Sequence, residues 1–261
     1  MGGNVYMIHG IMSGPWVWDN YRHYFEREGY TCAAATLRYH DMELQGKPDP
    51  ALGTTGLLDY AADLEREIST FDDRPILIGH SMGGLLAQIM AARGLAKALV
   101  LLTPVSPAGI MLLTPSAIRT FLRVHARWGF WRKPFRLGFN DAAYGILNKL
   151  PVHRQKEIYA NFVYESGRVL CEAAYWFFDP NRASSVDETK IDCPVLIINC
   201  MEDRVTPASV VRKIYRKYKH VATCREYTDH AHWPMAEPGW EKIARDAADW
   251  LRELPAGSNP G

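Results

Sequence analysis

Short apolar runs alternate with amphipathic stretches along most of this chain. Compact runs rich in β-branched residues predict buried strands, at residues 5–8, 32–37, 75–79, 98–102, 195–199 and 221–227. Apolar residues that recur at helical spacing predict helices, at residues 56–70, 85–93, 208–218 and 238–253. Strands that alternate with helices are typical of an α/β fold, in which a mostly parallel sheet is covered by helices on both faces.

Residues 104–185 interrupt this alternation. They are rich in aromatic residues, mostly helical in pattern, and contain no clear strand. Since they lie between two strand–helix units, we interpret them as a helical cap inserted over one edge of the sheet. The predicted organisation is a core formed by residues 1–103 and 186–254, a cap at 104–185, and a disordered tail at 255–261.

The composition is that of an ordinary globular protein. Of 261 residues, 48% are apolar and 23% are charged, and 30 Lys and Arg against 29 Asp and Glu give a formal charge of +1. This balance argues against a nucleic-acid binder, which usually carries a basic excess. There is no apolar run of roughly 18 residues, so a membrane-spanning helix is not expected. The first residues lack the pattern of a secretory signal, and we expect a cytoplasmic protein.

The five cysteines are scattered and form no CxxC pair. Scattered cysteines usually serve as small buried hydrophobes, so neither a disulfide framework nor a structural zinc site is expected. The sequence implies no metal and no cofactor.

The strongest chemical signal is the segment Gly-His-Ser-Met-Gly-Gly at 79–84. It follows a predicted strand and precedes a predicted helix, and a sharp turn there would expose the hydroxyl of Ser81 at the carboxyl end of the sheet. Gly79 and Gly83 remove side chains that would clash with such a turn. The helix that follows Ser81 presents unpaired backbone N–H groups, which favour a developing anion. The pattern predicts a nucleophilic serine.

A serine hydroxyl needs a base within hydrogen-bond reach, and the base needs an orienting partner. We expect the base to be a late histidine, and His232 lies between the last predicted strand and the last predicted helix. His230, two residues earlier, competes with it, and we favour His232. Surface positions are predicted for the histidines of helical and linking segments, which are His23, His40, His125, His153 and His220.

The orienting carboxylate is expected on the loop after the strand at 195–199, where Glu202 and Asp203 both stand. Either gives the chain order serine, acid, histidine that this type of turn requires. Residue pattern alone leaves both as candidates.

Together these residues resemble the α/β-hydrolase superfamily over nearly the whole chain. The resemblance rests on four segments in the order and spacing of that family, which are His9-Gly10, the segment 79–84, Asp203-Arg-Val-Thr-Pro and His232-Trp-Pro. It implies Ser81 as nucleophile, His232 as base and Asp203 as acid, because the D-x-x-T-P match favours Asp203 over Glu202.

The same resemblance implies an oxyanion hole formed by the backbone N–H groups of Ile11 and Met82, and it places a cap at 104–185. The two antiparallel strands that often precede the strand bearing His9-Gly10 are absent, so a sheet of about six strands is expected. This trimmed form resembles the small esterases related to plant methylesterases and hydroxynitrile lyases.

Residue types also argue against some of the activities found in this superfamily. A serine at position 81 argues against epoxide hydrolases and haloalkane dehalogenases, which use a carboxylate nucleophile. A hydroxynitrile lyase is expected to need a cap lysine near the triad, and no pattern places Lys149 or Lys156 there.

We therefore predict a serine hydrolase of esterase or lipase type, which cleaves carboxylic esters with an apolar acyl or alcohol part through an acyl-enzyme intermediate. Carbon–carbon bond hydrolysis, thioester cleavage and amide cleavage on the same triad are the alternatives. A non-catalytic ligand-binding protein is a third hypothesis.

An apolar pocket is expected beside the serine. Its predicted lining consists of Met12, Trp16, Val105, Trp128, Trp176, Val205 and Trp233, together with Ile11, Met82 and Phe177. The predicted partner is a small hydrophobic ester rather than a nucleic acid, and the chain is expected to be a monomer or a homodimer.

The net charge is unevenly distributed along the chain. Residues 104–185 hold eleven Lys and Arg and five Asp and Glu, a net charge of +6, and the rest holds 19 and 24, a net charge of −5. Four-residue spacing predicts one basic helix face, formed by Arg119, Arg123 and Arg127, with Ile118, Phe121, Leu122 and His125 on another. We expect the apolar face to cover the pocket, and a weak contact of the basic cap with an anionic lipid interface is a second hypothesis.

Overall fold

A six-stranded parallel sheet forms the centre of the molecule in this computed structural model, which describes residues 2–44 and 46–255. Its strands are β1 (Asn4–Ile8), β2 (Thr31–Ala34), β3 (Ile76–His80), β4 (Ala98–Leu102), β7 (Val195–Cys200) and β8 (Ala222–Tyr227). They are arranged in the order β2-β1-β3-β4-β7-β8, and each neighbouring pair is parallel. The predicted α/β fold and its six-stranded sheet are confirmed.

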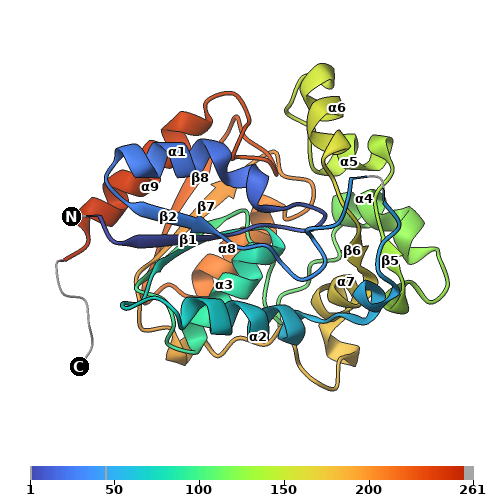
Figure 1. Cartoon of the computed structure of the whole chain (residues 1–261), viewed down its shortest axis with the longest axis horizontal. Coiled ribbons are helices and arrows are strands. Elements are labelled where there is room, and N and C mark those ends of the chain that lie inside the picture. Colours follow the sequence, from blue (N-terminus) through green and yellow to red (C-terminus); the bar gives the residue numbers. More distant parts are fainter. Residues whose placement is uncertain (1, 45, 256–261) are drawn as a thin grey trace.

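Helices cover both faces of this sheet (Figure 1). One face packs against α1 (Asp19–Arg27) and α9 (Trp240–Glu253), and the other packs against α2 (Leu57–Ile68), α3 (Met82–Ala92) and α8 (Ala208–Lys217). Successive strand residues point to opposite faces, so Val5 and Met7 join one apolar core while Tyr6 and Ile8 join the other. Sequence pattern predicted these helices except α1.

The predicted strand at 32–37 is too long. Ala35 still donates its N–H to the carbonyl oxygen of Met7, but the chain then turns away from the sheet, and the N–H of Leu37 donates to the imidazole Nε2 of His9 at 3.3 Å. A side chain therefore replaces the ladder partner that a longer strand would need.

The segment after β4 lies beyond the carboxyl ends of the strands, at the right of Figure 1. It contains α4 (Pro115–His125), β5 (Pro134–Phe135), α5 (Phe139–Gly145), α6 (Val152–Ala160), β6 (Glu165–Ser166) and α7 (Gly167–Ala174). The prediction that it contains no strand is wrong, because β5 and β6 form a short antiparallel pair. Two-residue strands are too short to leave an alternating pattern in the sequence.

Short 3₁₀ turns complete the described secondary structure. They are η1 (Pro15–Trp18), η2 (Pro50–Thr54), η3 (Phe130–Arg132), η4 (Trp176–Phe178) and η5 (Glu188–Lys190). Within residues 2–44 and 46–255, no helix is both long and apolar enough to cross a membrane. Of the tail predicted to be disordered, residues 256–261 lie outside the described residues.

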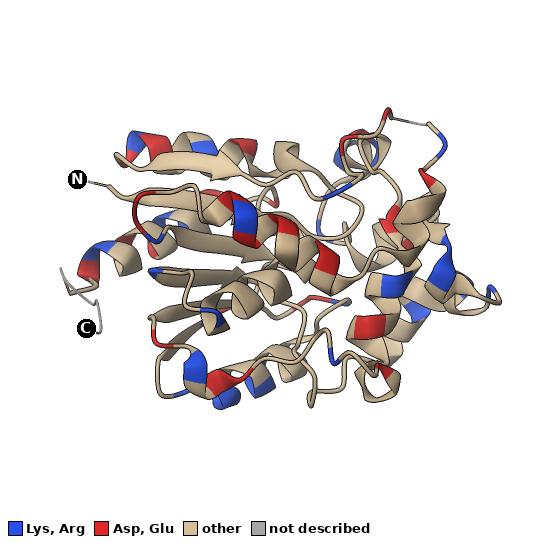
Figure 2. Ribbon diagram, turned by 60° about the horizontal axis from the view of Figure 1, so that its bottom comes forward, with Lys and Arg blue, Asp and Glu red and all other residues tan. Residues whose placement is uncertain are grey.

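Helix α4 is amphipathic, but its apolar face differs from the predicted one. Phe121 and Val124 are buried, whereas Ile118 and Leu122 are exposed. The helix ends at His125, so Arg127 lies in the turn that follows rather than on the helix. Figure 2 shows Lys and Arg, in blue, distributed over this part of the molecule.

Candidate active site

Ser81 stands at the sharp turn between β3 and α3. Its backbone angles, φ 53° and ψ −119°, are sparsely populated for a residue with a side chain. A Cβ atom on Gly83 would collide with the carbonyl oxygen of Ile8, and one on Gly79 would collide with the carbonyl oxygen of Gly83. Glycines are therefore required on both sides of the serine, as the sequence predicted.

Three side chains form a hydrogen-bonded row at this turn. The imidazole Nε2 of His232 lies 3.0 Å from Ser81 Oγ, and its Nδ1 lies 2.7 Å from Asp203 Oδ2. Because a carboxylate only accepts, Nδ1–H donates to Asp203, and Nε2 accepts from the serine hydroxyl. In this arrangement an imidazole can take the serine proton while the carboxylate orients the ring.

Asp203, rather than Glu202, reaches the imidazole. Its Oδ1 accepts from the backbone N–H of Thr206 at 2.9 Å, and its Oδ2 accepts from the Thr206 hydroxyl at 2.8 Å. These bonds fix the carboxylate plane beside His232. Glu202 instead lies at the surface, where Lys149 of the cap donates to its carboxylate at 2.7 Å. Lys149 is thus paired with Glu202, on the loop that carries Asp203.

Two residues without a predicted role, His80 of the segment 79–84 and Glu237, hold the loop that carries His232. His80 donates its Nε2–H to the carbonyl oxygen of His232 at 2.7 Å, and burial lowers the pKa of His80 well below its usual value, so this ring stays neutral. The carboxylate of Glu237 accepts from the N–H groups of Ala231 at 2.7 Å and Trp233 at 3.1 Å. Burial raises the pKa of Glu237 to about 7, although these two N–H groups lower it.

His230, the competing base, has a different environment. Its ring packs against Tyr227, with centroids 5.9 Å apart, and its backbone carbonyl accepts from the N–H of Glu202 at 3.0 Å. It thus links the two loops that carry Asp203 and His232. The structure places His232, and not His230, in hydrogen-bond contact with Ser81.

The candidate oxyanion donors belong to segments that touch Ser81. A Cβ atom on Gly10 would lie 3.0 Å from Ser81 Cβ, so the chain passes directly against the serine at Gly10. The segment from Gly10 to Ser13 is here called the oxyanion loop. Ile11 is the second residue of this loop. Met82 is the first residue of α3, where backbone N–H groups have no partner within the helix.

Several predicted pocket residues lie around this row. Val105 donates its N–H to the carbonyl oxygen of Ser81 at 2.9 Å. Trp233 follows His232 directly, and its ring packs against that of Trp16 with centroids 6.1 Å apart. The others in contact with these segments are Met12, in the oxyanion loop, and Val205, whose N–H donates to Asp203.

Other pocket assignments differ from the prediction. Trp128 is 84% exposed and packs edge-on against Trp131, so the prediction that it lines an apolar pocket is wrong. It follows the end of α4, and an aromatic run does not indicate which side of a turn its rings take. Trp176 and Phe177 line a separate cavity of about 410 Å³, together with Ala108 and Arg182.

The row is covered in this structure. Ser81 and His232 are each 1% exposed. Phe162, from the cap, packs against Trp233 with ring centroids 5.7 Å apart. Access of a substrate to the serine therefore requires side chains or backbone above it to move.

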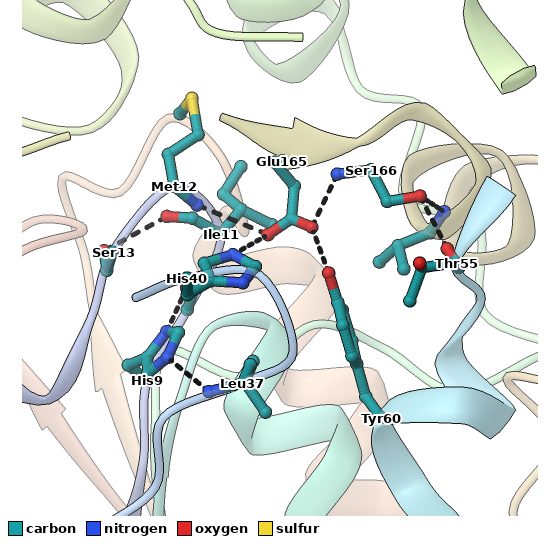
Figure 3. Close-up of polar contacts among 12 residues, drawn as sticks. His9, Ile11, Met12, Ser13, Leu37, His40, Thr55, Tyr60, Glu165 and Ser166 are labelled. Carbon is teal, nitrogen blue, oxygen red and sulfur yellow. Dashed lines mark hydrogen bonds and ion pairs between the residues drawn. The ribbon is translucent and has the colours of Figure 1, made fainter. Parts of the chain in front are cut away.

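A second buried pair of a carboxylate and a histidine lies where the cap meets the core. His40 was predicted to lie at the surface, and this is wrong, because its side chain is buried and its Nε2 lies 3.0 Å from Glu165 Oε2 (Figure 3). Glu165 is fully buried and comes from β6 of the cap, 125 residues away in the chain. No local motif joins the two residues, so their pairing could not be predicted from a sequence pattern.

All five cysteines are free thiols. Among residues 2–44 and 46–255, no group of three or more His, Cys, Asp or Glu side chains is arranged to hold a metal ion.

Comparison with known proteins agrees with this fold. A methylesterase from Arabidopsis thaliana, Methylesterase 7, is 30% identical over 88 residues, which are 33% of this chain and 32% of that protein. The matched segment thus spans about a third of that relative. A pyrethroid hydrolase from Sphingobium faniae JZ-2 has a TM-score of 0.68 at 18% identity, covering 97% of this chain and 98% of that chain.

Polyneuridine aldehyde esterase has a TM-score of 0.72 at 14% identity, covering 96% of this chain and 100% of that chain. At such identities, likeness to the solved structures shows the shared fold. The family model described as the alpha/beta hydrolase family matches residues 5–246, which is most of the sequence. The chain therefore belongs to the α/β-hydrolase family.

Proposed function

We propose that this protein is a serine hydrolase that cleaves carboxylic esters through an acyl-enzyme intermediate. The observation that carries the proposal is the hydrogen-bonded row of Ser81, His232 and Asp203 at a strained turn of an α/β-hydrolase fold. Nucleophile, base and orienting acid stand in the geometry that this chemistry requires.

In the proposed reaction, Ser81 Oγ attacks the ester carbonyl carbon while His232 Nε2 takes its proton. The N–H groups of Ile11 and Met82 donate to the oxyanion that develops, a contribution of a few kcal/mol each in comparable sites. The imidazolium then protonates the leaving alcohol. A water molecule, deprotonated by His232, attacks the acyl-enzyme and frees the carboxylic acid.

The substrate class that we propose is a small ester with an apolar acyl or alcohol part. Apolar, buried side chains adjoin the segments of the row, namely Met12, Val105, Val205 and Trp233. Such surroundings suit an apolar group better than a charged one. The similar proteins named above are described as a methylesterase, a pyrethroid hydrolase and polyneuridine aldehyde esterase, and two of these three names denote ester cleavage.

The test is hydrolysis of matched esters, thioesters and amides of increasing acyl length. We expect the esters to be cleaved fastest, Ser81→Ala to abolish hydrolysis with the fold unchanged by circular dichroism, and a fluorophosphonate probe to label Ser81. Ser184→Ala removes another buried hydroxyl, which donates to the carbonyl of Glu172, and is the matched control that keeps activity. Full activity in Ser81→Ala refutes the mechanism, and preferred cleavage of thioesters or amides refutes the ester class.

We also propose that the cap contacts an anionic lipid surface, from which apolar esters reach the site. The outward side of α4 combines exposed Ile118 and Leu122 with Arg119 and Arg123, and the exposed Trp128 follows. Apolar groups beside arginines suit the boundary between lipid headgroups and acyl chains. Two of these arginines also contact protein groups, which weakens their attraction to an anionic surface. The guanidinium of Arg119 lies 3.7 Å from the centre of the Tyr144 ring, and that of Arg123 lies 3.7 Å from the carboxylate of Asp141.

Charge reversal of Arg119, Arg123 and Arg127 to Glu tests this contact. We expect binding to phosphatidylglycerol vesicles to fall at least about tenfold, since each basic residue near such a surface contributes roughly 1 kcal/mol. Hydrolysis of a soluble short ester stays unchanged. The matched control reverses three exposed basic residues of the core, which are Lys213, Arg216 and Lys219. Equal binding by both triple variants would exclude the cap as the lipid contact.

A further inference from the structure

One residue of the oxyanion loop is held from three sides by the cap. Met12 donates its N–H to Glu165 Oε2 at 3.3 Å, and its carbonyl oxygen accepts from the N–H of Val163 at 2.9 Å. The N–H of Leu137 lies 3.3 Å from the Met12 sulfur. Met12 is fully buried and has φ 57°, in the left-handed region that costs free energy for a residue with a side chain. A loop with this conformation needs support from outside itself.

The carboxylate of Glu165 joins the cap to three separate core segments (Figure 3). Besides Met12 of the oxyanion loop, it accepts from the hydroxyl of Tyr60 in α2 at 2.9 Å and from His40 at 3.0 Å. It also accepts from the N–H of Ser166 at 2.7 Å. Both carboxylate oxygens are thus used, which a fully buried charge requires if it is to be tolerated.

The pair of Glu165 and His40 is charged. Burial alone would lower the pKa of His40, but the neighbouring carboxylate raises it above its usual value. Burial likewise favours the neutral form of Glu165, and the charge of His40 outweighs it and lowers the pKa of that carboxyl. His9, whose ring lies beside that of His40 with centroids 5.1 Å apart, stays neutral, because burial lowers its pKa to about 3. An ion pair with His40 therefore anchors the Glu165 carboxylate, which in turn accepts the N–H of Met12.

The position of Met12 matters because it shares a peptide unit with Ile11. That unit is planar, so the direction of the Met12 N–H fixes the direction of the Ile11 carbonyl and limits the rotation of Ile11 itself. The Ile11 carbonyl accepts in turn from the hydroxyl of Ser13 at 3.1 Å. The contacts of Met12 and Ser13 therefore restrict the ψ angle of Ile11, and through it the range of directions that the Ile11 N–H can take.

We propose that Glu165 is a positioning residue: by holding Met12 it keeps the N–H of Ile11 in the oxyanion hole, so that the hole is complete only while the cap is docked on the core. This inference rests on the proposed ester hydrolysis for its kinetic consequences, and on the contacts of Met12 for its structural ones. The cap is then part of the catalytic apparatus as well as a cover over the substrate.

The chain provides a matched control for this role. Glu172, in α7 of the cap, is also buried, accepts a core backbone N–H, that of Leu57, at 2.7 Å, and pairs with a cation, Arg168, at 2.7 Å. It differs from Glu165 in the segment that it holds, which is the start of α2 rather than the oxyanion loop. Loss of Glu172 removes one contact between the cap and α2, while Met12 keeps its three contacts with the cap.

The experiment compares Glu165→Gln with Glu172→Gln. For Glu165→Gln we expect kcat to fall about 10- to 100-fold with KM within about twofold, since a displaced oxyanion donor acts mainly on the transition state. A trifluoromethyl ketone, which forms a tetrahedral adduct with Ser81, binds more weakly by the same factor, and the matching methyl ketone binds unchanged. Glu172→Gln keeps kcat and both affinities near those of the wild type.

Amide hydrogen exchange of residues 10–13 provides a readout that does not depend on activity. We expect faster exchange in Glu165→Gln than in Glu172→Gln, even if the protein hydrolyses no ester. If Glu165→Gln cannot be purified folded, Tyr60→Phe removes one bond to the same carboxylate and is expected to give smaller changes in the same direction. Unchanged exchange, kcat and ketone discrimination in a folded variant of either kind would overturn the role of Glu165, and so would equal effects in Glu172→Gln. Failure of the wild type to hydrolyse esters or to label at Ser81 would instead overturn the proposed function.

Discussion

Two pairs of a carboxylate and a histidine are buried in this molecule, one in the core and one where cap and core meet. His232 lies 2.7 Å from Asp203, and His40 lies 3.0 Å from Glu165. The two histidines differ in the partner of the ring nitrogen that does not contact the carboxylate. For His232 it faces a serine hydroxyl, and for His40 it faces the carbonyl oxygen of Arg38 at 3.1 Å.

That partner decides the protonation state and thus what each pair can do. A hydroxyl can donate, so the imidazole of His232 can stay neutral and is free to take a proton. A carbonyl oxygen and a carboxylate both only accept, so both nitrogens of His40 donate and the ring is an imidazolium. The same two residue types therefore provide a candidate base in one place and a charged anchor in the other.

The largest expected effect is a loss of activity when the pair of His232 and Asp203 is changed. Asp203→Asn lets the amide donate to Nδ1 of His232, which places the ring proton on Nε2, where it cannot accept from Ser81. We expect kcat for ester hydrolysis to fall about 10⁴-fold, as in serine hydrolases with the same triad logic. Circular dichroism and urea unfolding check that the fold is retained. A loss of less than tenfold would mean that this pair does not orient a base.

The second-largest effect is expected for the pair of His40 and Glu165, and it is a loss of stability. His40→Ala leaves the buried carboxylate of Glu165 without its cation, and we expect the free energy of unfolding to fall by about 3–5 kcal/mol. Urea unfolding measures this, with His125→Ala as a control, because the ring of His125 contacts Tyr175 and has no carboxylate partner in the described contacts. The comparison breaks down if His40→Ala loses as much activity as Asp203→Asn while keeping full stability.

A smaller effect is expected from Glu237, a buried carboxylate near His232 that is held by backbone N–H groups rather than by a cation. Its pKa is about 7, against an ordinary value of 4.5. Between these two pH values the folded protein keeps a proton that the unfolded chain has lost, so this group lowers stability as the pH rises. The contribution is about 3 kcal/mol over that window.

Urea unfolding between pH 4.5 and pH 8 measures this slope. We expect Glu237→Gln to remove most of it, and Glu253→Gln, which changes an exposed carboxyl in α9, to leave it in place. Parallel stability curves for the wild type and Glu237→Gln would show that the carboxyl is already ionised in the folded protein.

The parts of the site that were predictable are those in which chemistry and local geometry coincide. Ser81 lies in a strand–turn–helix segment whose glycines are required by sterics, and Asp203 and His232 follow predicted strands at the same edge of a parallel sheet. Asp203 and His232 could be predicted as partners of Ser81 because the loops at that edge of the sheet lie close together. The sheet itself was predictable because buried parallel strands are continuously apolar.

What could not be predicted depends on contacts between distant segments. The pair of His40 and Glu165 spans 125 residues and carries no local pattern, so the default surface position for His40 was wrong. Helix α1 was missed, and only Tyr21 and Phe25 of its residues are buried. For α4, sequence periodicity identified a helix with two faces, but which residues face inward depends on the shape of the cap beneath it.

Met12 has a consequence for chemical probing of this protein. A thioether is oxidised by peroxide only where the oxidant can reach it, and Met12 is fully enclosed beneath the cap, whereas Met111 is 43% exposed. The rate at which Met12 forms its sulfoxide, measured against that of Met111 by mass spectrometry, therefore reports how often the cap separates from the core. Oxidation there would also place a bulkier, polar group in the loop beside Ser81, so oxidative damage during cap opening would inactivate the site from within.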